Sequence, residues 1–111
     1  MKILLVIDAD TLLQGYEALA MAFALAAFEH EVQLWLGQSM LAQILAQPTG
    51  KLANMLGSLA LYDIPAAWLV PTDWAALAHW RHAQPSQDID WLANIAPMPT
   101  NAPDFDLTLK L

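Results

Sequence analysis

The carboxylates of Asp8 and Asp10 are the first side chains along the chain whose spacing could support chemistry. They directly follow the apolar run Lys2–Ile7, which predicts a strand buried in a parallel sheet. Ligands of open α/β sheets bind beyond the carboxyl ends of the strands, and two carboxylates there could hold Mg²⁺. The same residues, with Thr11, are also good N-caps for a following helix. Asp8 and Asp10 therefore form a candidate switch-point loop, with helix capping as the simpler interpretation and no metal assigned.

Other residue types that carry chemistry lack partners at useful spacings. His79 and His82 lie three residues apart on a predicted helix, but no third metal ligand is near them, which favours two solvated histidines. The chain has no cysteine, so it can form neither a thiolate nor a disulfide. It also lacks a nucleophile elbow, a glycine-rich phosphate loop and a zinc-protease motif. We expect a chain that is not an enzyme and uses no cofactor.

Aromatic residues point to protein contacts instead. Five of the 111 residues are tryptophan, a residue type enriched at protein interfaces. Trp35 lies opposite the apolar face of its predicted strand. Trp80 points about 120° away from Trp74 on one helix, so we expect one of these two to be poorly covered. We take Trp35, Tyr62 and Trp80 as candidate interface residues.

The composition also favours a chain that is covered by partners. Hydrophobic residues make up 58% of it and charged residues 14%, against about 45–50% and about 25% in typical domains. A net charge of −7 disfavours direct contact with nucleic acid and excludes a polybasic membrane anchor. The longest apolar run, Ala18–Phe28, is far shorter than the roughly 20 residues of a membrane span. We expect a cytoplasmic protein whose surplus apolar surface is buried by other chains.

Strands and helices alternate along most of the sequence. The predicted strands are 2–7, 31–36, 66–70, 89–96 and 104–111, and the predicted helices are 12–30, 40–46, 51–62 and 74–82. The proline-rich stretch Pro97–Pro103 has no helical pattern. This alternation predicts a single α/β domain with a mainly parallel sheet of about five strands and helices on both faces.

A helix ending in Leu-Tyr-Asp-Ile at residues 61–64, followed by Trp68, resembles the TusC/DsrF family of DsrE-like proteins. The segment Asp104–Leu111 is similar to the last strand of that family, and the opening strand and Glu17–Leu19 also fit. The resemblance covers nearly the whole chain.

The resemblance implies one DsrE-like, flavodoxin-like domain over residues 1–111. Members of the family assemble with TusD/DsrE-like and TusB/DsrH-like subunits as a dimer of trimers. Those complexes relay persulfide sulfur towards tRNA 2-thiouridine or in sulfur oxidation, through a cysteine of the TusD/DsrE-type subunit. The matching strand end here, near Leu69, has no thiol. The expected function is therefore that of a non-catalytic structural subunit of a hetero-oligomeric sulfur relay.

Two segments depart from the family pattern. A helix usually precedes the last strand, where this chain has Pro97–Pro103, and the turn Gly37–Ser39 replaces an acidic-glycine turn. One face of the sheet is then bare or covered by a partner. An alternative function is a small-ligand-binding or regulatory module that acts as a homo-oligomer, with its pocket at Asp8 and Asp10.

Overall fold

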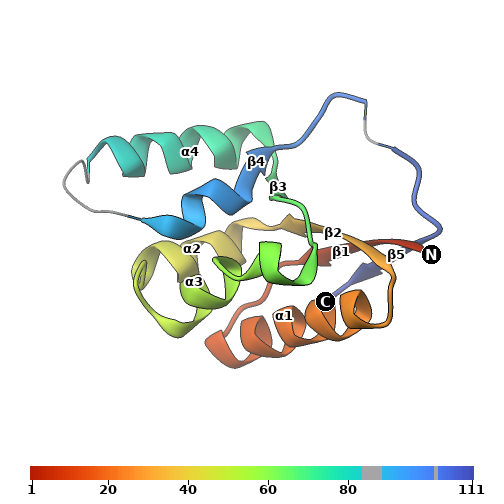
Figure 1. Cartoon of the computed structure of the whole chain (residues 1–111). Helices are drawn as coiled ribbons and strands as arrows, with labels where there is room; N and C mark the ends of the chain where they lie inside the picture. The colour runs from red at the N-terminus through yellow and green to blue at the C-terminus, as the bar shows by residue number, and fades with distance from the viewer. Residues whose placement is uncertain (84–88, 102) are drawn as a thin grey trace.

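Parallel strands and α-helices alternate along the chain (Figure 1). The structure is a computed structural model, and it describes residues 1–83, 89–101 and 103–111. Its elements, in order, are β1 (Lys2–Ile7), α1 (Leu12–Ala27), β2 (Glu31–Leu36), α2 (Gln38–Ala46), α3 (Lys51–Leu56), the 3-10 helix η1 (Leu59–Tyr62), β3 (Ala67–Leu69), α4 (Pro71–His82), the 3-10 helix η2 (Asp90–Asn94), β4 (Ile95–Pro97) and β5 (Leu107–Lys110).

The five strands form one sheet in the order β4-β3-β2-β1-β5, and every neighbouring pair is parallel. The predicted fold class is confirmed: the described residues form a single α/β domain with an all-parallel sheet and four α-helices, consistent with a flavodoxin-like arrangement. The first four strands follow the chain across the sheet, whereas β5 returns to the far side of β1. The order in which the chain adds strands to the sheet therefore reverses between the neighbours β1 and β5.

The main core lies between one face of the sheet and α1, α2 and α3. Alternate residues of β1 and β2 point into it, as the period of two in a strand requires. These residues, all 3% exposed or less, are Ile3, Leu5, Ile7, Val32, Leu34 and Leu36. Helix α1 approaches closely because Gly15 has no side chain. A Cβ there would lie 3.1 Å from Leu52 and 3.3 Å from the Met40 sulfur.

The opposite side of the sheet, which we call the second face, stands apart from this core. Its residues in the central strands are Leu4, Val6, Gln33, Trp35 and Trp68. None of the apolar ones belongs to the main core as the described residues define it. Val6, Trp35 and Trp68 lie side by side across β1, β2 and β3, because each is the register partner of the next.

The connection between β4 and β5 forms a wide arc that does not pass over α1, α2 or α3 and returns beside the N-terminus (Figure 1). Phe105 of this connection packs edge-on against Trp68, with ring centroids 6.0 Å apart. The chain must cross four strand spacings, about 19 Å, and also return to the amino ends of the strands. The nine residues 98–106 would extend only about 14 Å as a helix but about 30 Å as extended chain. The absence of a helix among the described residues of this connection, expected from its prolines, follows from this distance.

Several predicted boundaries differ from the structure. The predicted strand 89–96 is mostly η2, and only its last two residues belong to β4. Helix α4 begins at Pro71, because a proline fits the first helical position, where its missing N–H has no partner to lose. The predicted helix 51–62 is divided at Gly57 into α3 and η1. The sequence Ala-Gln-Pro-Ser-Gln-Asp at residues 83–88 predicts a turn, and most of it lies outside the described residues.

Candidate functional site

The carboxylate of Asp8 is used to cap a helix. It lies beyond the end of β1 and accepts a hydrogen bond from the backbone N–H of Ser39, at 2.8 Å. That N–H belongs to the first turn of α2, whose own N-cap residue, Gly37, has no side chain to offer. The close approach depends on this glycine, because a Cβ on Gly37 would lie 2.4 Å from the Asp8 carboxylate carbon.

Asp10 has a different role, at the start of α1. It is exposed, and its backbone N–H donates to the Gln14 side chain at 3.0 Å. Thr11 is the N-cap residue, and its hydroxyl accepts from the Gln14 N–H at 3.1 Å. Helix capping therefore accounts for the geometry of the Asp8 carboxylate, whereas Asp10 takes part in the start of α1 through its backbone N–H.

A cavity of about 450 Å³ lies beside this loop, at the reversal point between β1 and β5. Asp8, Asp10 and Glu17 contribute carboxylates to it, and Met21 and Leu111 contribute apolar surface. Within the described ranges, no group of three or more histidines and carboxylates is arranged to hold a metal ion. His79 and His82 are exposed on α4, where solvated histidines were predicted.

The three candidate interface residues lie on three different parts of the molecule. Trp35 is half-buried on the second face. Tyr62 is 42% exposed and stacks on Phe23 of α1, with ring centroids 4.3 Å apart. Trp80 packs against the main core and lies 6.2 Å from the buried ring of Trp91.

Trp74 is the more exposed of the two tryptophans of α4, at 36%. The spacing of Trp74, Leu77 and Ala78 predicts one apolar face on this helix, but only Leu77 is buried. Trp91 of η2 packs instead against Trp80. Which tryptophan of α4 is covered depends on Trp91, a residue of the predicted strand 89–96, and the spacing of residues on α4 does not reveal this contact.

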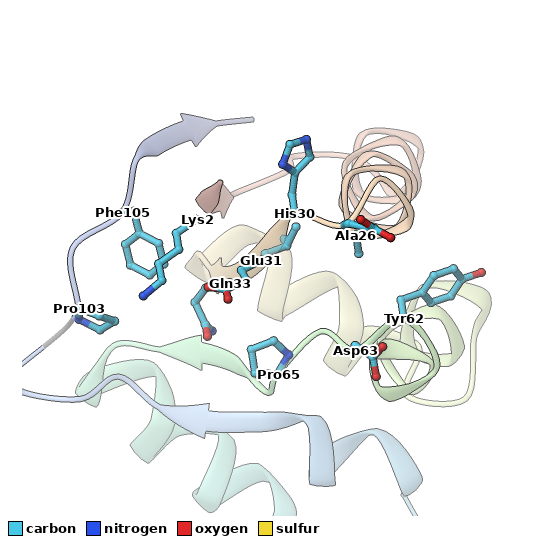
Figure 2. A pocket seen from close by; sticks show the side chains of 12 residues that line it. Lys2, Ala26, His30, Glu31, Gln33, Tyr62, Asp63, Pro65, Pro103 and Phe105 are labelled. Atoms are coloured by element: carbon cyan, nitrogen blue, oxygen red, sulfur yellow. The ribbon is translucent and has the colours of Figure 1, made fainter.

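A second cavity, of about 520 Å³, opens at the amino ends of β1 and β2 (Figure 2). Figure 2 shows Phe105 and Tyr62 on opposite sides of it, with His30, Glu31 and Gln33 between them. The cavity joins the second face, through Gln33 and Phe105, to the corner of the molecule that carries Tyr62.

The Leu-Tyr-Asp-Ile segment builds that corner. Leu61 is 83% exposed, whereas Ile64 is 4% exposed and belongs to the main core. Asp63 lies between them in the left-handed conformation, with φ of 58°, and so turns the chain from η1 towards β3. The segment therefore anchors itself by Ile64 and presents Leu61 and Tyr62 outwards.

The sequence interpretation missed Trp68, Phe105 and Leu61 as surface candidates. Strand parity could have placed Trp68 on the same side of the sheet as Trp35, because each lies between two residues that point into the main core. Nothing local indicates that Phe105 reaches Trp68, which lies 37 positions earlier, because the contact depends on the path of the connection.

Comparisons with protein-family models, with curated proteins and with solved structures gave no match. Among the described residues, no helix is both long and apolar enough to cross a membrane. The candidate site is therefore defined by its own geometry: an apolar second face, a cavity at its amino edge and an exposed corner at Leu61 and Tyr62.

Proposed function

We propose that this chain is a non-catalytic structural subunit of a cytoplasmic sulfur-relay complex of the TusBCD or DsrEFH kind. In this proposal it binds TusD/DsrE-like and TusB/DsrH-like subunits, and the persulfide is carried by a cysteine of the TusD/DsrE-like partner. The chain supplies a docking surface and contributes no reactive thiol.

The second face is the observation that carries this proposal. Trp35 and Trp68 lie next to each other there, outside the main core, and the described residues of the β4–β5 connection form no helix over them. Large aromatic side chains at the centre of a patch are the residues that most often dominate binding energy. A partner that covers Val6, Trp35 and Trp68 would complete a layer that the nine-residue connection cannot supply.

Two further features agree with a docking role. The exposed corner at Leu61 and Tyr62 lies beside the amino-edge cavity, whose lining of both apolar and charged residues connects it to the second face at Gln33. The Asp8 carboxylate, which could have served a ligand site, instead makes a capping contact at α2, and Asp10 contacts the first turn of α1 through its backbone N–H. These contacts favour the structural-subunit proposal over the alternative of a small-ligand module at Asp8 and Asp10.

Co-expression with DsrE-like and DsrH-like chains from the same organism, followed by native mass spectrometry, tests the proposal. The expected result is a complex that contains all three chains and whose persulfide mass shift, after sulfur loading, is confined to the DsrE-like chain. Recovery of this chain without either partner under conditions where the partners bind each other would overturn the proposal.

A further inference from the structure

The outer edge of β5 has no strand paired to it among the described residues. β5 is the last strand in the sheet order, and within the described ranges it pairs with β1 alone. An edge strand offers unpaired N–H and C=O groups to any strand that can align with it, and most proteins block such edges with charges, prolines or bulges. The charges at this edge have an arrangement that favours one particular partner.

Two charges are placed symmetrically about Thr108: Lys110 at the end of β5 and Asp106 just before its start, where one carboxylate oxygen accepts a hydrogen bond from the Lys2 N–H. Asp106 precedes this residue by two positions, and Lys110 follows it by two. Thr108 and Lys110 point to the side of Leu4 and Val6, with which they are in register. In an antiparallel pair of two β5 strands centred on Thr108, each Asp106 would lie opposite the Lys110 of the other copy. Opposite charges at directly facing positions stabilise a strand pair, whereas like charges destabilise it.

The apolar residues of β5 obey the same symmetry on the other side of the sheet. Leu107 is 40% exposed, and Leu109 is only partly buried against the main core. The register that pairs Asp106 with Lys110 also places the Leu107 of each copy opposite the Leu109 of the other. An apolar face that is incompletely covered in one copy thereby gains a cross-strand neighbour.

We propose that two copies of this chain associate through antiparallel pairing of their β5 edges, centred on Thr108, and so join their two five-stranded sheets into one. The pairing is isologous, as a twofold axis requires. The Asp106–Lys110 pairs would lie at the β5 edge, on the same side of the sheet as the second face. Trp35 and Trp68 lie further across the sheet, on β2 and β3, and take no part in the pairing, and neither does the corner at Leu61 and Tyr62. This inference stands independently of the sulfur-relay proposal.

The strength of such a dimer is limited by its size. A pairing over about five residues buries less than the roughly 800 Å² per partner of a standard stable interface. We therefore expect reversible association, which a concentration series from micromolar to millimolar protein detects by analytical ultracentrifugation.

Charge exchange provides a test that is specific for the register. In Lys110→Asp, two aspartates face each other across the axis on both sides, and in Asp106→Lys, two lysines do so. Each variant alone should dimerise at least about tenfold more weakly than the wild type, because two symmetry-related pairs change sign together. A mixture of the two variants restores opposite charges at both positions and should form a heterodimer close to wild-type strength.

Circular dichroism and thermal melting of each variant provide the folding control, since the Asp106 carboxylate also accepts a hydrogen bond from the Lys2 N–H at 2.8 Å. The proposal is overturned by a wild type that stays monomeric throughout the concentration series. It is equally overturned by folded variants that each dimerise as the wild type does, or by folded variants that do not restore each other's dimerisation when mixed.

A cross-link offers a second readout that does not depend on charge. Facing Cα atoms of an antiparallel pair lie about 4.5–5.5 Å apart, which is within the range of a disulfide. Because the chain has no cysteine, Thr108→Cys gives each copy a single thiol, at the proposed axis. Under mild oxidation or with a short bismaleimide, this variant should form a covalent dimer at least tenfold faster than Thr72→Cys, an exposed threonine on α4. Equal rates for the two variants would contradict the proposed axis.

Discussion

At the scale of single residues, Asp8 shows how a group suited to chemistry can be committed to structure. Its carboxylate satisfies a backbone N–H at the start of α2, and Gly37 leaves the space for it. The sequence predicted that Asp8 could cap the helix that follows it directly, α1, whereas the structure shows it capping α2. The actual partner, the Ser39 N–H, is 31 residues away and becomes adjacent only when β1 and β2 pair.

Gly37→Ala is therefore expected to lower the free energy of unfolding by about 2–4 kcal/mol, the sum of overpacking and of a lost cap. The added methyl group would meet three Asp8 atoms at 2.4–2.6 Å. Asp8→Ala, which removes only the cap, should cost about 1 kcal/mol. Urea unfolding measures both, and Gly57→Ala, whose nearest contact would be 3.3 Å away, serves as the control with an expected change within about 0.5 kcal/mol. Equal effects of the two glycine variants would contradict the close approach at Asp8.

The backbone conformation of Glu29 lowers the stability of the fold. It follows the C-cap of α1 with φ of 68°, a left-handed conformation that glycine adopts without strain. We expect Glu29→Gly to raise the free energy of unfolding by about 0.5–1 kcal/mol. Glu29→Ala keeps the Cβ and should change it by less than about 0.5 kcal/mol. Thermal melting of the two variants distinguishes them, and a lower melting temperature for Glu29→Gly would refute this assignment.

At the scale of elements, the sequence predicted the type of structure well where a pattern was long and periodic. β1 and β2 have the predicted bounds, and α1 differs only at its C-terminal end, where three residues fall outside the helix. The prediction of a strand over 89–96 was wrong for most of its length, because long-range contacts of its apolar residues hold the segment as η2. Trp91 is 3% exposed, and its indole N–H donates to the Pro48 carbonyl at 2.9 Å. Such a contact fixes η2 in place, and no local periodicity reports it.

The buried side chain of Trp91 should consequently contribute much more to the free energy of unfolding than an exposed tryptophan such as Trp74. We expect Trp91→Ala to lower the free energy of unfolding by about 3–5 kcal/mol, and Trp91→Phe by about 1 kcal/mol through the lost hydrogen bond. Trp74→Ala is the matched control on α4 and should cost less than about 1 kcal/mol, because Trp74 is 36% exposed. Chemical denaturation compares the three variants. A small effect of Trp91→Ala would mean that η2 is not anchored by this side chain.

At the scale of the whole molecule, the distribution of apolar surface is what the sequence could anticipate only in outline. The high hydrophobic content predicted surfaces buried by partners, and parity placed Trp35 away from the main core. Strand order and register place Val6, Trp35 and Trp68 in one row. How much of this row the β4–β5 connection covers depends on the length of that connection. Composition and local spacing carry no information about either.

The central claim is that the second face binds the sulfur-relay partners, and a pair of tryptophan variants tests it most directly. Trp35→Ala and Trp74→Ala remove the same side chain, from the second face and from the exposed side of α4 respectively. The measurement is the affinity of each variant for the DsrE-like and DsrH-like chains, by titration calorimetry, after circular dichroism has shown that both variants are folded. We predict that Trp35→Ala weakens binding by about 2 kcal/mol or more, roughly thirtyfold, while Trp74→Ala binds as the wild type does. Equal binding by both variants would show that the partners do not use the second face.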